Sequence, residues 1–219
     1  MTRRSPVAVF VETGSKRVIA GAIDWPGWCR VAKTEELAID ALATYASRYT
    51  LVAARAGEVF PAASEFIVAE RVRGNATTDF GAPASRLPGD VRPVPVAEID
   101  RLIALMRAAW ATLEAVASRT PQSLRPGPRG GGRDRDRMLE HVLGAEHAYA
   151  RKLGVHTRPP ALGDQTAIEA FRDGVMSRCR NVAAADESSP QTSWPVRYFI
   201  RRLTWHALDH AWEMEDRSA

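Results

Sequence analysis

Three of the five histidines in this sequence lie where helical periodicity would carry imidazole rings into a protein interior. Two of them, His206 and His210, are four residues apart in the segment WHALDH, and this spacing puts both rings on one face of a helix. The same face continues the apolar stripe of Val196, Phe199 and Leu203. Both rings are therefore expected to point inward.

A third histidine, His141, lies on a second apolar stripe that contains Met138, Val142, Ala145 and Tyr149. Three neutral imidazoles with an open fourth position form a ligand set for a catalytic divalent metal, and the cores of helix bundles are where such sites are built. The pattern predicts a metal centre of His141, His206 and His210. The alternative, three hydrogen-bonded core histidines, stays open. Imidazole suits several transition metals, of which Zn or Ni is expected here.

Two glutamates are candidates for orienting these ligands by hydrogen bonds. Glu213 lies one turn beyond His210, where it either orients that ring or pairs with a nearby arginine on the surface. Glu146 either approaches the site from the helix of His141 or is solvated. A zinc-protease HExxH motif is excluded, because an alanine directly follows the first histidine of the pair.

The other histidines and the cysteines carry weaker signals. His147 falls on a different helix face and His156 follows a glycine, so both are expected to face solvent. Cys29 and Cys179 have no partner at catalytic spacing and are too few for a disulfide framework, which favours a reducing cytoplasm. Cys29 is expected to pack as a small hydrophobic side chain.

The elements that must position the histidines follow from a helical period that begins near residue 98. The apolar spacing predicts four helices, at about 96–118, 134–153, 164–183 and 194–215. The Gly-rich and Pro-rich segment at 125–133 and the segment at 186–190, which ends in a proline, are expected as loops. Four helices with no strands between them favour a four-helix bundle.

The N-terminal part has a β-β-α pattern. Two apolar runs, 6–12 and 16–24, predict strands, and Thr34 is expected to cap a helix that continues through Tyr49. A third extended run lies at 65–73. The expected fold is therefore α+β, with a small module over 1–73, a Gly-rich and Pro-rich linker over 74–97, and a helix bundle over 98–219.

The composition narrows the function classes. The 219 residues are 45% hydrophobic and 26% charged, as in ordinary globular proteins. No apolar run reaches the length of a membrane helix, and the start lacks a signal-peptide apolar region, so a cytoplasmic protein with no membrane partner is expected. The net charge is +4, but the arginines alternate with acidic residues and only one RGGGR segment occurs. A nucleic-acid partner is not expected, because such proteins cluster their basic residues.

Residues 98–215 resemble the DinB/YfiT-like superfamily of four-helix metalloproteins. The resemblance rests on EIDRLIALMRAAWATLEAV, on GGRDRDRMLEHVLGAEHAYARKLG and on RYFIRRLTWHALDHAWEMEDR. It implies that His141, His206 and His210 are the metal ligands. It also implies a metal-dependent transferase that uses a low-molecular-weight thiol, as maleylpyruvate isomerases and thiol S-transferases do. The arginine-rich, lysine-poor composition fits an actinobacterial source, and with this resemblance such a source would favour mycothiol over bacillithiol or glutathione.

Residues 6–50 are similar to HicB-like antitoxin domains. The matching pieces are a Pro-Gly after the second strand and a Thr-Glu-Glu start to an alanine-rich helix. This resemblance implies a fold more than an activity, and no helix-turn-helix follows it.

Three functions stay open at this stage. The first is a metal-dependent hydrolase or thiol S-transferase that acts on a small-molecule substrate, with the N-terminal module at the pocket mouth or in a homodimer interface. The second is a non-catalytic binding or regulatory protein that docks a partner on that module. The third is a nucleic-acid binder, which would lose affinity steeply with salt.

Overall fold

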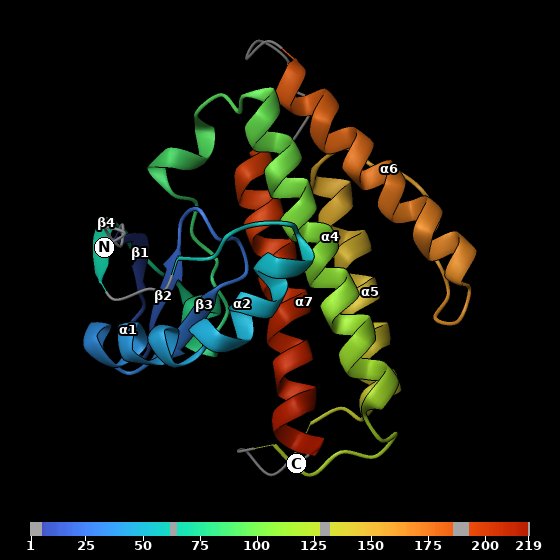
Figure 1. The fold of residues 1–219 in the computed structure, drawn as a ribbon, viewed down its shortest axis with the longest axis horizontal. Helices are drawn as coiled ribbons and strands as arrows, with labels where there is room; N and C mark the ends of the chain where they lie inside the picture. Colours follow the sequence, from blue (N-terminus) through green and yellow to red (C-terminus); the bar gives the residue numbers. More distant parts are fainter. Residues whose placement is uncertain (1–5, 62–64, 128–131, 186–192, 219) are drawn as a thin grey trace.

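The computed structural model describes residues 6–61, 65–127, 132–185 and 193–218 (Figure 1). Over these ranges the chain forms a mixed α+β fold with seven α-helices and one four-stranded sheet, which confirms the expected α+β class. None of these helices has the length and apolar character needed to cross a bilayer. The loop expected at 186–190 and most of the RGGGR segment lie outside the described residues.

The sheet consists of β1 (Val7–Thr13), β2 (Val18–Ala22), β3 (Cys29–Ala32) and β4 (Phe66–Arg73), in the spatial order β3-β2-β1-β4. β2 pairs antiparallel with β1 and β3, whereas β4 runs parallel to β1. The three extended runs of the sequence are confirmed as strands, and β3 is an addition to them. Its four residues directly follow the Trp-Pro-Gly-Trp turn and are too few to show a period of two.

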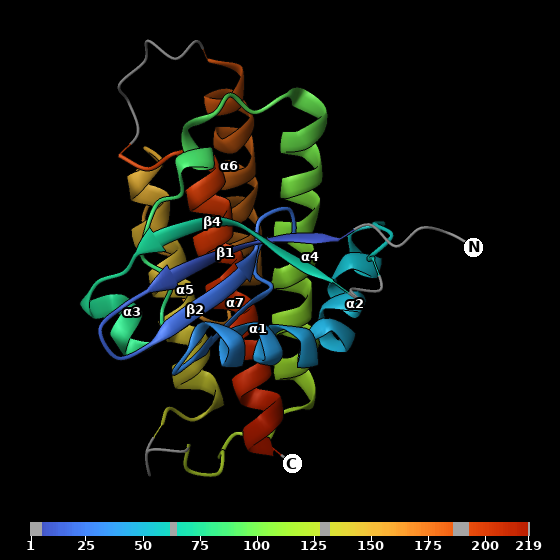
Figure 2. The ribbon, with the colours of Figure 1, turned by 90° about the vertical axis from the view of Figure 1, so that its left-hand side faces the viewer.

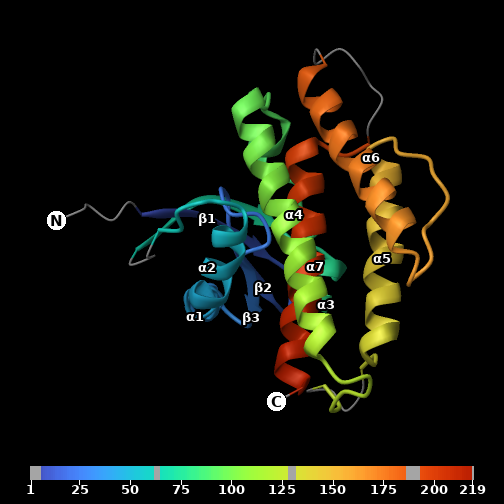
Figure 3. The same cartoon turned by 45° about the vertical axis from the view of Figure 1, so that its right-hand side comes forward.

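Both faces of the sheet are covered. On one face, Val9, Val11 and Ala20 share a core with α1 (Glu35–Thr44) and α2 (Ala46–Arg55). On the other face, Phe10, Ile19 and Cys29 pack with Trp205 of the last helix. Figure 2 shows the sheet with that helix behind it, and Figure 3 shows α1 and α2 on the opposite side. Burial on both faces explains why β1 is a continuous apolar run rather than an alternating one.

The helix expected after Thr34 is divided in two. Thr34 caps α1 as predicted, because its hydroxyl accepts a hydrogen bond from the Leu37 amide. The helix ends at Tyr45, which packs against Trp212 of the last helix, and α2 begins at the next residue. The buried positions of α1 are Ala38 and Leu42, whereas Leu37 is 52% exposed.

The four long helices agree closely with the predicted ranges. They are α4 (Val96–Arg119), α5 (Arg135–Lys152), α6 (Gln165–Ala184) and α7 (Val196–Ser218). α7 contacts α4, α5 and α6 and also the Trp205 side of the sheet, and 15 of its 23 residues are buried. It therefore forms the centre of the molecule, between the sheet and the other long helices (Figure 1).

The segment 74–97, expected as a linker, packs against the rest of the protein. It contains the short helix α3 (Ala76–Phe80) and the 3-10 helix η1 (Pro88–Val91). The buried carboxylate of Glu12 in β1 accepts hydrogen bonds from the Thr78 hydroxyl and from the amides of Ala84 and Ser85. At the other end, Asp90 forms a buried, two-point ion pair with Arg201 of α7. These bonds attach the segment to both the sheet and the central helix.

Candidate metal centre

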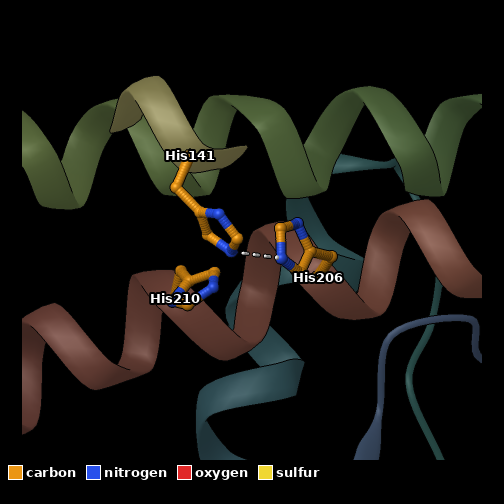
Figure 4. A group of neighbouring side chains, drawn as sticks. All are labelled: His141, His206 and His210. Atoms are coloured by element: carbon orange, nitrogen blue, oxygen red, sulfur yellow. Dashed lines mark hydrogen bonds between the residues drawn. The ribbon is translucent and has the colours of Figure 1, made fainter. Parts of the chain in front are cut away.

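α5 and α7 bring the three histidines together. His141 comes from α5, while His206 and His210 come from successive turns of α7, and their rings converge on one point (Figure 4). One ring nitrogen of each residue lies within 4.8 Å of the others. The ring centroids are 4.7 to 5.1 Å apart. The inward placement expected from the two apolar stripes therefore produces a real cluster.

Burial favours the neutral form of two of these rings, His206 and His141. His206 is 6% exposed, and its burial, reinforced by the neighbouring His210 and His141, lowers its pKa to about 2. Burial is also the main reason why the pKa of His141 is lowered, and the charge of Arg133 adds to the effect. A neutral imidazole keeps a nitrogen lone pair, which is the form that binds a metal.

The spacing of two of these nitrogens suits a tetrahedral ion. The Nε2 atoms of His141 and His206 are 3.2 Å apart. Two nitrogens bound to one tetrahedral zinc at about 2.0–2.1 Å from it would be about 3.3–3.4 Å apart. Among the described residues the cluster contains three candidate ligands, so a bound ion would have a fourth position open for water or a substrate atom. The donor set therefore suits a divalent metal, and the spacing of the His141 and His206 nitrogens matches a tetrahedral site.

Glu213 fixes the orientation of His210. Its Oε2 is 2.9 Å from Nδ1 of His210, and its Oε1 accepts a hydrogen bond of 2.9 Å from Arg217. The hydrogen bond with His210 is the main reason why the pKa of Glu213 is lowered. With Nδ1 donating to the carboxylate, Nε2 of His210 keeps its lone pair for the cluster. Both roles considered for Glu213, ring orientation and pairing with an arginine, are present at once.

Glu146 takes part in a different contact. It is 1% exposed, and its carboxylate lies 3.3 Å from Nε of Arg172 in α6. None of its hydrogen bonds among the described residues reaches the histidines, so it neither orients them nor is solvated. The reason is its position, because five residues separate it from His141 and turn it about 140° around α5.

The remaining histidines and cysteines stay outside the cluster. His156 is exposed as expected, and His147 is partly exposed and lies 2.8 Å from the Thr157 carbonyl oxygen. Cys29 and Cys179 are buried with free thiols. Burial raises the pKa of Cys179 to about 12 and also raises that of Cys29. Both thiols therefore pack as small hydrophobic groups.

One side of the cluster has residues that the sequence did not single out as functional. The rings of Tyr149 and Trp205 lie 5.9 Å and 5.8 Å from the ring of His206. The Arg202 guanidinium lies over both of these aromatic rings, at 5.6 Å and 4.7 Å, and its charge helps to lower the pKa of His206. Arg202 precedes His206 by four residues, so the helical spacing could have identified it.

No family model, curated protein or solved structure matches this sequence.

Proposed function

We propose that this protein is a metal-dependent enzyme of the DinB/YfiT type, in which His141, His206 and His210 hold a divalent ion, Zn or Ni. The observation that carries the proposal is the convergence of three ring nitrogens within 4.8 Å. The arrangement of α4 to α7 supports the family assignment, since four long helices follow one another without a strand and the ligands come from the second and the last of them. A HicB-like module would then precede the bundle.

A bound ion would lower the pKa of water or of a low-molecular-weight thiol and stabilise the resulting nucleophile. The protein contributes the rest. Glu213 holds His210 in one tautomer, and the Arg202 guanidinium offers a positive charge to an anionic group of the thiol or the substrate. The reaction class is thiol S-transfer or hydrolysis on a small electrophilic molecule.

Elemental analysis of the untagged protein tests this proposal, with His210→Ala and His147→Ala compared against the wild type. We expect about one divalent ion per chain in the wild type, because three histidines with an open position form a complete catalytic site. His210→Ala should lose most of that metal. His147→Ala should retain it, since this ring contacts the Thr157 carbonyl and lies outside the cluster.

Little metal in the wild type after reconstitution would overturn the proposal, and so would equal loss in both variants. In that case the histidines are core residues, and the alternative from the sequence, a binding or regulatory protein, becomes the better account. Thiol-transfer and hydrolysis assays are then uninformative, and the search moves to partners of the N-terminal module.

A further inference from the structure

A cleft of about 560 Å³ lies between α4, α5 and α6. The amino-terminal end of α6 lies farther from α4 than the carboxy-terminal end of α6 does, as Figure 1 shows. This divergence of the two helices leaves space for the cleft. His141 lies on another side of α5, and none of the three clustered histidines lines the cleft. Its volume is in the range of pockets that bury small organic ligands.

Most of the surface of the cleft is apolar, and six of its lining residues have large aliphatic side chains. They are Leu113, Leu139, Val142, Leu143, Leu162 and Ile168. Leu162 is 40% exposed, which is a large fraction for a leucine beside a cavity. An apolar ligand body that covers this surface would remove apolar area from water, which would favour binding.

Three charged side chains of the lining are joined to one another. Arg172 of α6 pairs with Glu146 of α5, 3.3 Å away, and also with Glu114 of α4. Its guanidinium lies 4.8 Å above the ring of Trp110. One arginine therefore pairs with two carboxylates, and with both carboxylates ionised this group has a net charge of −1. Arg135 and Asp136, which also line the cleft, form a separate ion pair whose two charges cancel.

The environment of Glu146 makes the excess negative charge costly. Its carboxylate is buried, and burial raises its pKa even though Arg172 acts in the opposite direction. A ligand that adds a positive charge would offset this cost. A ligand carboxylate would instead meet two glutamates, and the Arg172 donors that it needs are already engaged.

We propose that this cleft binds a small amphipathic cation, a molecule with an aliphatic or aromatic body and one amine. The apolar body lies against the leucines of the wall, and the ammonium group lies beside Glu114 and Glu146. This inference does not depend on the metal centre.

Isothermal titration calorimetry with the full-length protein tests it, using octylamine, octanol and octanoate as probes with matched apolar bodies. Octylamine should bind about tenfold more tightly than octanol, because a charge-assisted hydrogen bond adds to the same apolar burial. Octanoate should bind most weakly. His210→Ala should leave the affinity for octylamine unchanged, which separates this site from amine binding at a metal.

Two variants locate the charge. Glu146→Gln should reduce octylamine affinity to that of octanol, and so should Glu114→Gln, whose half-exposed side chain makes it tolerant to substitution if the buried change impairs folding. Glu140→Gln, at an exposed position of α5, is the matched control. The proposal is overturned if octylamine does not bind or if octanoate binds as tightly as octylamine. It is also overturned if both cleft variants keep the wild-type affinity for octylamine, or if sedimentation shows a dimer in which a second copy of the chain covers the cleft.

Discussion

The contact between Glu213 and His210 determines which nitrogen of that ring faces the cluster. Because the carboxylate lies 2.9 Å from Nδ1, the ring is held with Nε2 toward the other two histidines. Glu213 is itself held by Arg217, which also donates hydrogen bonds to the carbonyl groups of Arg125 and Arg133. The ligand geometry thus depends on a short chain of hydrogen bonds that ends on the backbone.

We expect Glu213→Gln to lower the metal affinity of the protein by about 10- to 100-fold, because the neutral amide orients and polarises the ring less well. A titration against a chromophoric chelator measures this affinity. Glu140→Gln serves as the control, since that side chain is exposed and distant in sequence from α7. If Glu213→Gln binds metal as tightly as the wild type, the carboxylate does no more than pair with Arg217.

The residues of the cluster were predictable from spacing, whereas their surroundings were not. The i, i+4 pair of His206 and His210 on an apolar stripe determines their direction without any knowledge of the tertiary fold. The role of Glu146 depends on the angle between α5 and α6, which no local pattern encodes. Arg202 could be placed one turn from His206, but its position over Tyr149 requires the packing of two helices.

At the scale of the elements, the long helices were predictable because their apolar periodicity extends over five or more turns. Short elements were not. β3 has four residues, and the division between α1 and α2 depends on Tyr45 packing against a tryptophan more than 160 residues away in sequence. The connection 74–97 has a composition typical of loops. That composition does not reveal that Asp90 forms a buried ion pair with Arg201 of α7.

An ion pair joins the first turns of α4 and α7. Arg197 binds both carboxylate oxygens of Glu98, one of them at 2.9 Å, and also donates to the Pro93 carbonyl. The hydrogen bond from Arg197 is the main reason why the pKa of Glu98 is lowered. A carboxyl whose pKa is lower in the folded protein adds stability above its unfolded pKa, and this stability is lost as the pH falls through the folded value.

Glu98→Gln should therefore reduce the free energy of unfolding at pH 7 by up to about 1 kcal/mol, since the pair is partly exposed. Below pH 4 the difference between variant and wild type should shrink. Urea unfolding at pH 7 and pH 3.5 measures both quantities. A difference that stays constant between these pH values would show that the ionised pair contributes nothing and that the substitution acts through packing.

The turn before β3 lies directly against α7. Gly27 has a φ of +93°, and a Cβ there would lie 2.7 Å from Leu208 and 2.8 Å from Thr204. Gly57 also has a positive φ, +75°, but a Cβ there would have no neighbour within 4 Å. Substitutions at the two glycines therefore distinguish two free-energy costs. One is the cost of a left-handed backbone for a residue with a Cβ, and the other is the cost of placing that Cβ against α7.

Gly57→Ala should lower the free energy of unfolding by about 1 kcal/mol, through the left-handed backbone alone. Gly27→Ala should add about 1–3 kcal/mol to that cost, because the methyl group must displace the side chains of α7. Urea denaturation of both variants measures the difference. Equal losses of stability in the two variants would mean that the turn can move away from α7 at no cost in free energy. The close packing of the turn against α7 would then be contradicted.

At the scale of the whole molecule, α7 belongs to two cores at once. Trp205 packs with Phe10 and Ile19 on the sheet, and the next residue, His206, contacts His141 of α5 in the histidine cluster. The change to a helical period near residue 98 suggests two separate parts, but in the structure the sheet and the bundle both pack against α7. Stabilisation of the histidine cluster should therefore also stabilise the sheet.

This coupling predicts the effect of zinc on strand β1. A metal that binds only the folded protein stabilises it by about 2.7 kcal/mol at a free concentration 100 times Kd. If unfolding of the sheet requires release of α7, the amides of Val9 and Val11, paired with β2 and β4, should exchange more slowly by the corresponding factor of about 100. Hydrogen exchange with and without zinc measures it, and His210→Ala should abolish the effect. Protection confined to α5 and α7 would instead mean that the N-terminal module opens independently of the metal centre.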